Sequence, residues 1–180
     1  MKKLILTFGV TLALVMSACS DKKETTTDAT EVTAPEAMDE DVAEFFEKAS
    51  LSGMFTAQAA QLAQDMATNP EVKNLAAKLM SDHDQANQKL MTMARTMNVQ
   101  LPQMSQNYQD KLDELRNAGA DFDKKYLEMV EETHKASLRH YEEAADETEN
   151  AELKTFVQQT MTTMRGHEEM VERLKEQMGA

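Results

Sequence analysis

The sequence predicts an all-α protein whose main part is a single four-helix bundle, and three observations support this. The chain of 180 residues is rich in strong helix formers and contains only 5 Gly, 3 Pro and no Trp. Apolar residues recur at heptad spacing in long segments, which is typical of helices with one buried face. The connections between these segments are short, long and short, an order that suits a bundle with one crossover.

The first nineteen residues predict export and lipid attachment. Lys2 and Lys3 precede an apolar run, Leu4 to Met16, that is too short to act as a membrane anchor. The motif Met16-Ser17-Ala18-Cys19 resembles a bacterial lipobox, although Leu is more usual where Met16 stands. We therefore expect a signal peptide over residues 1–18 and a lipid on Cys19. The alternative, a plain signal peptide, would leave Cys19 as a free thiol in an oxidising compartment.

The next segment predicts a tether to the cell envelope. Ser20 after Cys19 resembles the signal for the outer membrane in enterobacterial-type sorting, so we expect the domain to face the periplasm. Residues 19–38 have no apolar periodicity, which is typical of a disordered tether with a reach of roughly 25 Å. The bundle then occupies residues 39–180.

The charge of the chain excludes some partners. The formal net charge is -13, and removal of residues 1–18 with their two lysines would make it -15. Such an acidic chain argues against nucleic-acid binding and against electrostatic attachment to anionic lipid. Contact with the membrane is therefore expected to depend on the lipid at Cys19, and the sequence identifies no protein partner.

The first predicted helix runs from Asp39 to Thr68. Acidic residues fill its first turns, as the helix dipole favours. Its apolar arc is wide, so the sequence leaves open which face is buried. The candidates for this face are Phe45, Phe46, Ala49, Leu51, Ser52, Phe55, Thr56, Ala59, Leu62, Ala63 and Met66.

The second predicted helix extends from Asn69, its N-cap, to Asn98, with Pro70 at the first helical position. The turn before it is so short that the first two helices must be antiparallel neighbours. A histidine, His83, occupies a position in its buried row where leucine is expected. This row consists of Val72, Ala76, Leu79, His83, Ala86, Leu90, Met93 and Met97.

Residues 98–120 form a long crossover that contains a short helix with Tyr108, Leu112 and Leu115. A connection of this length can return the chain to the start of the second helix. The second and third helices would then be parallel, as in ferritin-like bundles.

The third and fourth predicted helices also carry one histidine each in a buried row. The third opens at Asp121 as N-cap and reaches Glu147, and the fourth runs from Asn150 to Met178. Their rows are Leu127, Glu131, His134, Leu138, Tyr141 and Ala145, and Leu153, Val157, Thr160, Met164, His167, Val171, Leu174 and Met178.

The three histidines are expected at one height in the bundle. His83 lies 13 residues after Pro70 and His134 lies 13 residues after Asp121, so in parallel helices both are roughly 20 Å from the same end. Counting back from the last turn places His167 within one turn of His134. The fourth histidine, His140, falls beside the buried row and is expected to be solvated.

This convergence predicts a transition-metal site of His83, His134 and His167 with Glu131, since imidazole is the commonest ligand of such metals. Cu, Fe or Zn would fit, and thioether ligands would favour copper. The alternative is a purely structural polar layer in the core. Further ligands or supporting groups are sought among Asp82, Thr56, Met80, Met164 and Tyr126.

Several short motifs together resemble the bacterial domain of unknown function 4142 family, over about residues 39–174. The motifs are Phe45-Phe46-Glu47-Lys48-Ala49, Gly53-Met54, Asn69-Pro70-Glu71-Val72, Met80-Ser81-Asp82-His83, Gly119-Ala120-Asp121-Phe122-Asp123, Tyr126, His134 and His167. The resemblance implies a ferritin-like four-helix fold in an envelope protein and no established activity. Members of the family often have an acidic residue where Thr56 stands, which argues against a ferritin-type di-iron centre here.

Enzymatic activity is not favoured by the sequence. A di-iron oxidase normally needs inward carboxylates from all four helices, and the buried rows of the second and fourth helices contain none. No hydrolase or phosphate-binding motif is present. Two hypotheses therefore remain, a metal-binding envelope lipoprotein and a structural or interaction module.

Overall fold

The computed structural model describes residues 40–179, all of them helical or in the connections between helices. The predicted signal peptide, Cys19 and the tether lie outside the described residues. The helices are α1 (Glu40–Met66), α2 (Pro70–Thr96), α3 (Gln106–Arg116), the 3-10 helix η1 (Gly119–Asp121), α4 (Phe122–Glu147) and α5 (Ala151–Met178).

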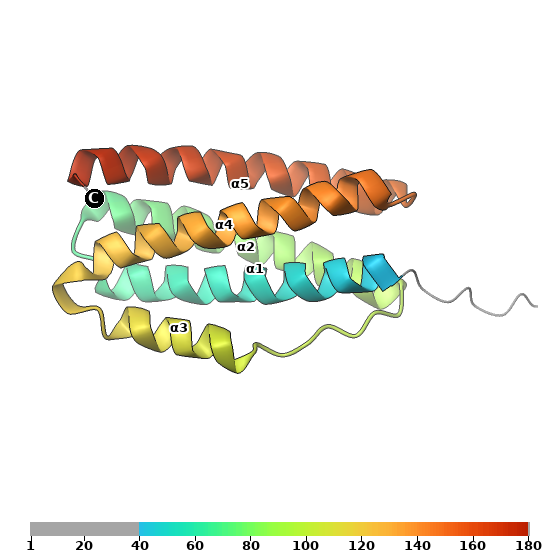
Figure 1. Cartoon of the computed structure of the whole chain (residues 1–180), viewed down its shortest axis with the longest axis horizontal. Coiled ribbons are helices and arrows are strands. Elements are labelled where there is room, and N and C mark those ends of the chain that lie inside the picture. Colours follow the sequence, from blue (N-terminus) through green and yellow to red (C-terminus); the bar gives the residue numbers. More distant parts are fainter. Residues whose placement is uncertain (1–39, 180) are drawn as a thin grey trace, which may run out of the picture. The chain divides into compact units, whose positions relative to one another are not determined.

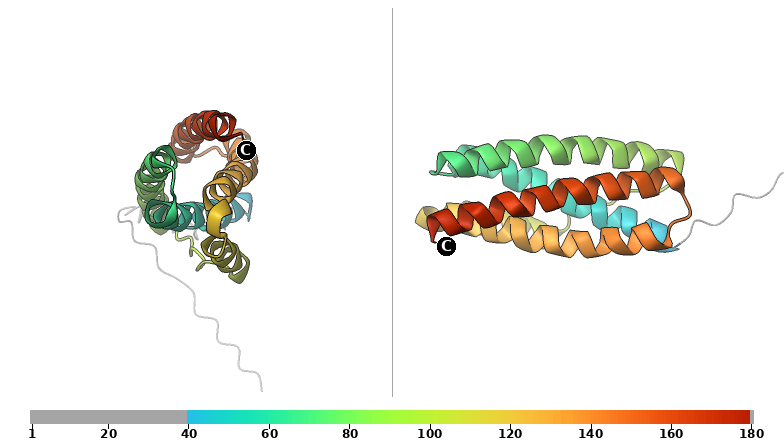
Figure 2. Two further views of the ribbon diagram at one scale, coloured as in Figure 1. Left: turned by 90° about the vertical axis from the view of Figure 1, so that its left-hand side faces the viewer. Right: turned by 90° about the horizontal axis from the view of Figure 1, so that it is seen from above.

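The four long helices form the predicted bundle, and the short α3 lies in the crossover (Figure 1). Helix α1 packs antiparallel to α2, and α4 packs antiparallel to α5; α1 also contacts α4, and α2 contacts α5 (Figures 1 and 2). Helices α2 and α4 run in the same direction, as the length of the crossover predicts. Helix α3 packs outside the bundle on α1 and α4. Within residues 40–179, every helix is too short or too polar to cross a lipid bilayer.

Side-chain caps set the starts of α2 and α5, whereas α3 and α4 begin without one. The side chain of Asn69 accepts a hydrogen bond from the backbone N–H of Glu71 at 2.8 Å, and Asn150 caps α5 in the same way. At α4, however, the predicted cap Asp121 makes no capping hydrogen bond with its side chain. The chain instead enters α4 through η1, which begins at Gly119 with a positive φ of 59°.

The structure resolves which face of α1 is buried. Phe46, Ala60 and Ala63 are fully buried, whereas Met66 is 37% exposed. On the same face, a Cβ at Gly53 would lie 2.1 Å from Oδ1 of Asn87 on α2. The glycine therefore leaves room for the side chain of Asn87 against α1.

The core has two apolar parts, and the histidines lie between them along three helices. On α4, Val130 belongs to one apolar cluster and Leu138 to the other, with His134 between them. On α2, the same clusters contain Leu79 and Leu90, on either side of His83. One apolar cluster thus packs above the histidine layer along the bundle, and the other packs below it.

Candidate metal centre

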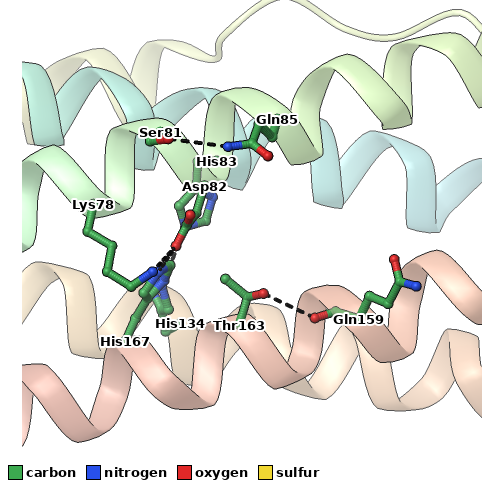
Figure 3. A network of polar contacts seen from close by, with 9 residues as sticks. All are labelled: Lys78, Ser81, Asp82, His83, Gln85, His134, Gln159, Thr163 and His167. Carbon is green, nitrogen blue, oxygen red and sulfur yellow. Dashed lines mark hydrogen bonds and ion pairs between the residues drawn. The ribbon is translucent and has the colours of Figure 1, made fainter.

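The imidazoles of His83, His134 and His167 meet inside the bundle, as their heptad positions predict (Figure 3). His134 and His167 are each 1% exposed, and His83 is 8% exposed. Nε2 of His134 lies 3.5 Å from Nε2 of His83 and 3.2 Å from Nδ1 of His167. One nitrogen from each ring lies within 4.8 Å of the other two, so this group could hold a metal ion.

The outer nitrogens of two rings are engaged by groups that can only accept hydrogen bonds. Nδ1–H of His134 donates to the backbone carbonyl of Val130 at 3.0 Å. Nε2–H of His167 donates to Oδ2 of Asp82 at 2.8 Å. A carboxylate in this position is a common means of orienting a histidine that binds a metal.

These outer bonds determine where the ring protons are. A neutral imidazole carries one N–H, so the inner nitrogens of His134 and His167 are both left with lone pairs. Those two lone pairs face each other across 3.2 Å and cannot form a hydrogen bond. Only His83 could place a proton at this point. No described residue bonds to its Nδ1, so its single N–H can be at Nε2 and point to His134. The centre of the cluster therefore has more acceptors than donors.

The electrostatics of the layer favour neutral rings. Burial, together with the nearby His167, lowers the pKa of His83 to about 4. Burial also lowers the pKa of His134 well below its usual value. Burial lowers the pKa of His167, although the hydrogen bond to Asp82 opposes this effect. All three side chains are therefore available as neutral ligands near neutral pH.

Asp82 is itself held in place. Burial raises the pKa of Asp82, but hydrogen bonds from Lys78 and His167 outweigh this effect and lower it overall. Nζ of Lys78 lies 2.8 Å from the same oxygen that accepts from His167. The carboxylate is thus ionised, and its charge is balanced by a lysine at the surface.

The spacing of the ring nitrogens suits a tetrahedral metal ion. Nitrogen ligands at about 2.0–2.1 Å from a tetrahedral centre are about 3.3–3.4 Å from one another. The separations of 3.2 and 3.5 Å, which both involve His134, lie on either side of that value, and the third pair of nitrogens lies within 4.8 Å. The two nitrogen pairs that include His134 therefore already have the spacing of a tetrahedral site.

Glu131, which sequence analysis groups with the three histidines, is not brought to them. Its two oxygens accept hydrogen bonds from Lys135 and from Lys175, the latter at 2.5 Å. Bonds from Lys135 and Lys175 lower the pKa of Glu131. The two lysines draw this carboxylate to the surface, and Asp82 is the carboxylate that contacts the histidine layer.

Of the other residues predicted to support the site, one lines a cavity beside His167, and the contacts of the rest are with other groups. The hydroxyl of Thr56 donates to the carbonyl of Ser52 on its own helix, and the sulfur of Met80 accepts from Gln64. No residue within 40–179 forms a hydrogen bond with the buried hydroxyl of Tyr126. Met164 is buried in the apolar core and lines a cavity beside His167.

A cavity of about 390 Å³ opens between α2 and α5, and His83 and His167 form part of its wall. Thr163 and Gln159 line it along α5, and Figure 3 shows Thr163 between the histidines and Gln159. The sequence did not indicate this cavity. Nor did it indicate the hydrogen bond of His134 to the carbonyl of Val130, although these residues are four positions apart on one helix.

Comparison with known proteins identifies a family and supports the fold. Residues 27–174 match the family described as domain of unknown function (DUF4142). The fold is similar to the crystal structure of a DUF305 fragment from Deinococcus radiodurans, with a TM-score of 0.70 and 11% sequence identity. That similarity covers 77% of this chain and 97% of the fragment, and it concerns the fold alone. No curated protein matches the sequence significantly. Because the family match spans most of the chain, the protein belongs to the DUF4142 family.

Proposed function

We propose that this protein binds one transition-metal ion through Nε2 of His83, Nε2 of His134 and Nδ1 of His167. The observation that carries the proposal is the excess of acceptors at the centre of the cluster. Val130 and Asp82 hold the protons of two rings on the outside, so their inner lone pairs point at the same place. A cation at this point would satisfy all three nitrogens at once.

The donor set favours Zn(II) or Cu(II). Imidazole nitrogen suits Zn, Cu and Fe, and the spacing of the two nitrogen pairs that include His134 agrees best with tetrahedral Zn(II). Soft thioether ligands would favour Cu(I), but Met80 is directed at Gln64 on α1. An iron centre of the carboxylate type has weaker support, because Glu131 is bound by two lysines.

The rival function is a structural polar layer without metal, and burial of the three rings is the observation that favours it. In that case His83 would donate to His134, and the inner nitrogen of His167 would be left without a donor. An unsatisfied buried group of this kind costs on the order of 1–3 kcal/mol. The rival therefore predicts that His167→Leu does not lower the stability of the protein.

Metal stoichiometry distinguishes the two functions. The purified bundle would be stripped with a chelator and titrated with Zn(II) and Cu(II) by calorimetry, and native mass spectrometry would count the bound ions. We expect one ion per chain for the wild type and none for His134→Leu. His140→Leu is the matched control, because His140 is on the same helix but contacts Glu143 and Lys48, away from the three histidines. No stoichiometric binding by the wild type would refute the proposal.

We also propose that the protein is exported and anchored to the cell envelope by a lipid on Cys19, with the bundle in the periplasm. The supporting observation is the sequence Met16-Ser17-Ala18-Cys19 after a basic start and an apolar run. Metabolic labelling with a fatty-acid analogue would test it, with Cys19→Ser as the unlabelled variant. Equal labelling of both proteins, or of neither, would contradict the anchor.

A further inference from the structure

We propose that the metal centre keeps one coordination position open toward the cavity between α2 and α5, and that this position takes a small monovalent anion. The inference rests on the proposed metal binding and adds the chemical class of a ligand. Three protein ligands with an open fourth position are the usual arrangement of a zinc site that exchanges ligands, whereas structural zinc sites have four protein ligands.

The described part of the chain brings three imidazole ligands to the centre and no carboxylate as a fourth. Among the His, Cys, Asp and Glu side chains of residues 40–179, the compact group that could hold a metal ion consists of His83, His134 and His167. The nearest carboxylate, Asp82, accepts from the outer nitrogen of His167 and from Lys78. A tetrahedral ion bound here would therefore need one ligand from outside these groups.

The cavity supplies the space for that ligand. His83 and His167 line it, whereas the fully buried His134 does not. The side of the centre formed by His83 and His167 thus faces the cavity, and His134 closes the opposite side. With a volume of about 390 Å³, the cavity has room for a small anion with accompanying water.

The charges around the centre select an anion. The three imidazoles are neutral ligands and leave the double charge of the metal ion without compensation. The negative charge of Asp82 is already balanced by Lys78. Lys89 lines the cavity, and no described carboxylate forms an ion pair with it. Since an uncompensated charge in a buried site is costly, an anion is favoured over a neutral molecule at the open position.

Met164 is the protein group that competes with this assignment, because it lines the same cavity and carries a soft sulfur. Its side chain is 2% exposed and belongs to the apolar cluster that also contains Phe156 and Val157. We assign it to the core and include it as a variant in the test.

Azide is a suitable probe, because its complex with Cu(II) has a charge-transfer absorption band. The experiment first measures the Cu(II) affinity of the wild type and of each variant, and then titrates the Cu(II)-loaded proteins with azide. Azide is expected to add to the metal as a water molecule leaves, and to give a saturable band with one azide per ion. Metal-loaded wild type that shows no such band would overturn the inference while the proposed function stands. Absence of Cu(II) binding would refute both.

Three variants and one control test the open position, and all four are expected to keep their Cu(II) affinity within about threefold. Lys89→Gln should weaken azide binding about two- to fivefold, whereas Lys73→Gln, the matched change outside the cavity on α2, should have no effect. Ala86→Leu should narrow the cavity on the side of α2 and weaken azide binding at least about tenfold. Met164→Leu should leave azide binding unchanged. Equal azide affinity in all variants, or tighter binding in Met164→Leu, would overturn the assignment to this cavity.

Discussion

Two buried polar clusters of this bundle differ in how completely their atoms are satisfied. At one end of the molecule, the carboxylate of Asp123 on α4 is 7% exposed and accepts hydrogen bonds from the backbone N–H of Thr68, the hydroxyl of Thr68 and the backbone N–H of Asn69. These bonds are 2.7–3.0 Å long and tie α4 to the turn between α1 and α2. In the histidine layer, by contrast, two acceptor nitrogens face each other at 3.2 Å.

In the proposed function, one of these clusters is structural and the other binds a metal ion. A buried acceptor that already has donors from its own chain needs nothing further, and its removal costs stability. A buried group of acceptors without enough protons is complete only when a cation binds. The Asp123 cluster should therefore matter for folding with or without metal, whereas the histidine layer should gain stability from metal.

The largest expected effect is stabilisation by metal. At a free Zn(II) concentration 1,000 times the Kd, the free energy of unfolding of the wild type should rise by about 4 kcal/mol, because the ion binds only the folded chain. His134→Leu should lose this increase and His140→Leu should keep it. Thermal unfolding with and without Zn(II), followed by circular dichroism, measures the effect. If Zn(II) did not change the melting temperature of the wild type, the histidine layer would be a structural cluster like that of Asp123, and the distinction would be wrong.

The next effect is acid destabilisation of the metal-free protein. The pKa of His83 is lowered to about 4 in the folded chain, against about 6.5 when unfolded. Between these values the unfolded chain binds more protons, so stability is complete above about pH 6.5 and falls as the pH drops toward 4. His83 alone accounts for a loss on the order of 3 kcal/mol. Urea titrations from pH 7 to 4 should show this slope in the wild type and a smaller one in His83→Leu; identical slopes would contradict burial of a neutral His83.

Removal of the carboxylate of Asp123 should cost less, about 2 kcal/mol, because Thr68 is at the surface and its donors can bind water. Asp123→Ala should lower the free energy of unfolding by this amount and leave the metal affinity unchanged. The control is Asp121→Ala, two residues earlier, whose side chain makes no capping hydrogen bond. Urea denaturation with and without Zn(II) measures both quantities. Equal stability of the two variants would show that the Asp123 cluster is dispensable.

The smallest expected effect concerns the carboxylate that orients His167. Asp82→Ala should weaken metal binding about tenfold, because the outer N–H of His167 loses its acceptor. Glu131→Ala should change the metal affinity by less than about twofold, since Glu131 bonds to Lys135 and Lys175. Competition against a chromophoric chelator gives both constants. A larger loss of metal affinity in Glu131→Ala than in Asp82→Ala would mean that Glu131, and not Asp82, supports metal binding.

The height of the histidines could be predicted because helices impose a regular geometry. The positions of His83 and His134 after their helix starts, together with the helical rise, placed them at one level, and the structure confirms that the rings meet. The direction of α4 relative to α2 also followed from the length of the crossover. The heptad rows of apolar residues and the lengths of the helices and of the crossover were therefore sufficient to predict the bundle and its histidine layer.

The partners of the histidines could not be predicted in the same way. Glu131 is three residues before His134 on α4, yet Lys175 from α5 draws it to the surface. Asp82 is adjacent to His83 in the sequence but bonds to His167 across the bundle. The contact of Asp123 with Thr68 joins residues 55 positions apart. Such choices depend on which side chains meet across helices, and a pattern within one helix does not contain that information.

The most direct measurement of the central claim is the metal K-edge X-ray absorption spectrum of the bundle loaded with one Zn(II) ion per chain. The proposed site predicts three imidazole nitrogens at about 2.0–2.1 Å from the Zn(II) ion, with the outer-shell scattering that is typical of histidine rings. His134→Leu should lose this signature. A first shell made only of oxygen, with no imidazole scattering, would show that the ion binds elsewhere and would contradict the account.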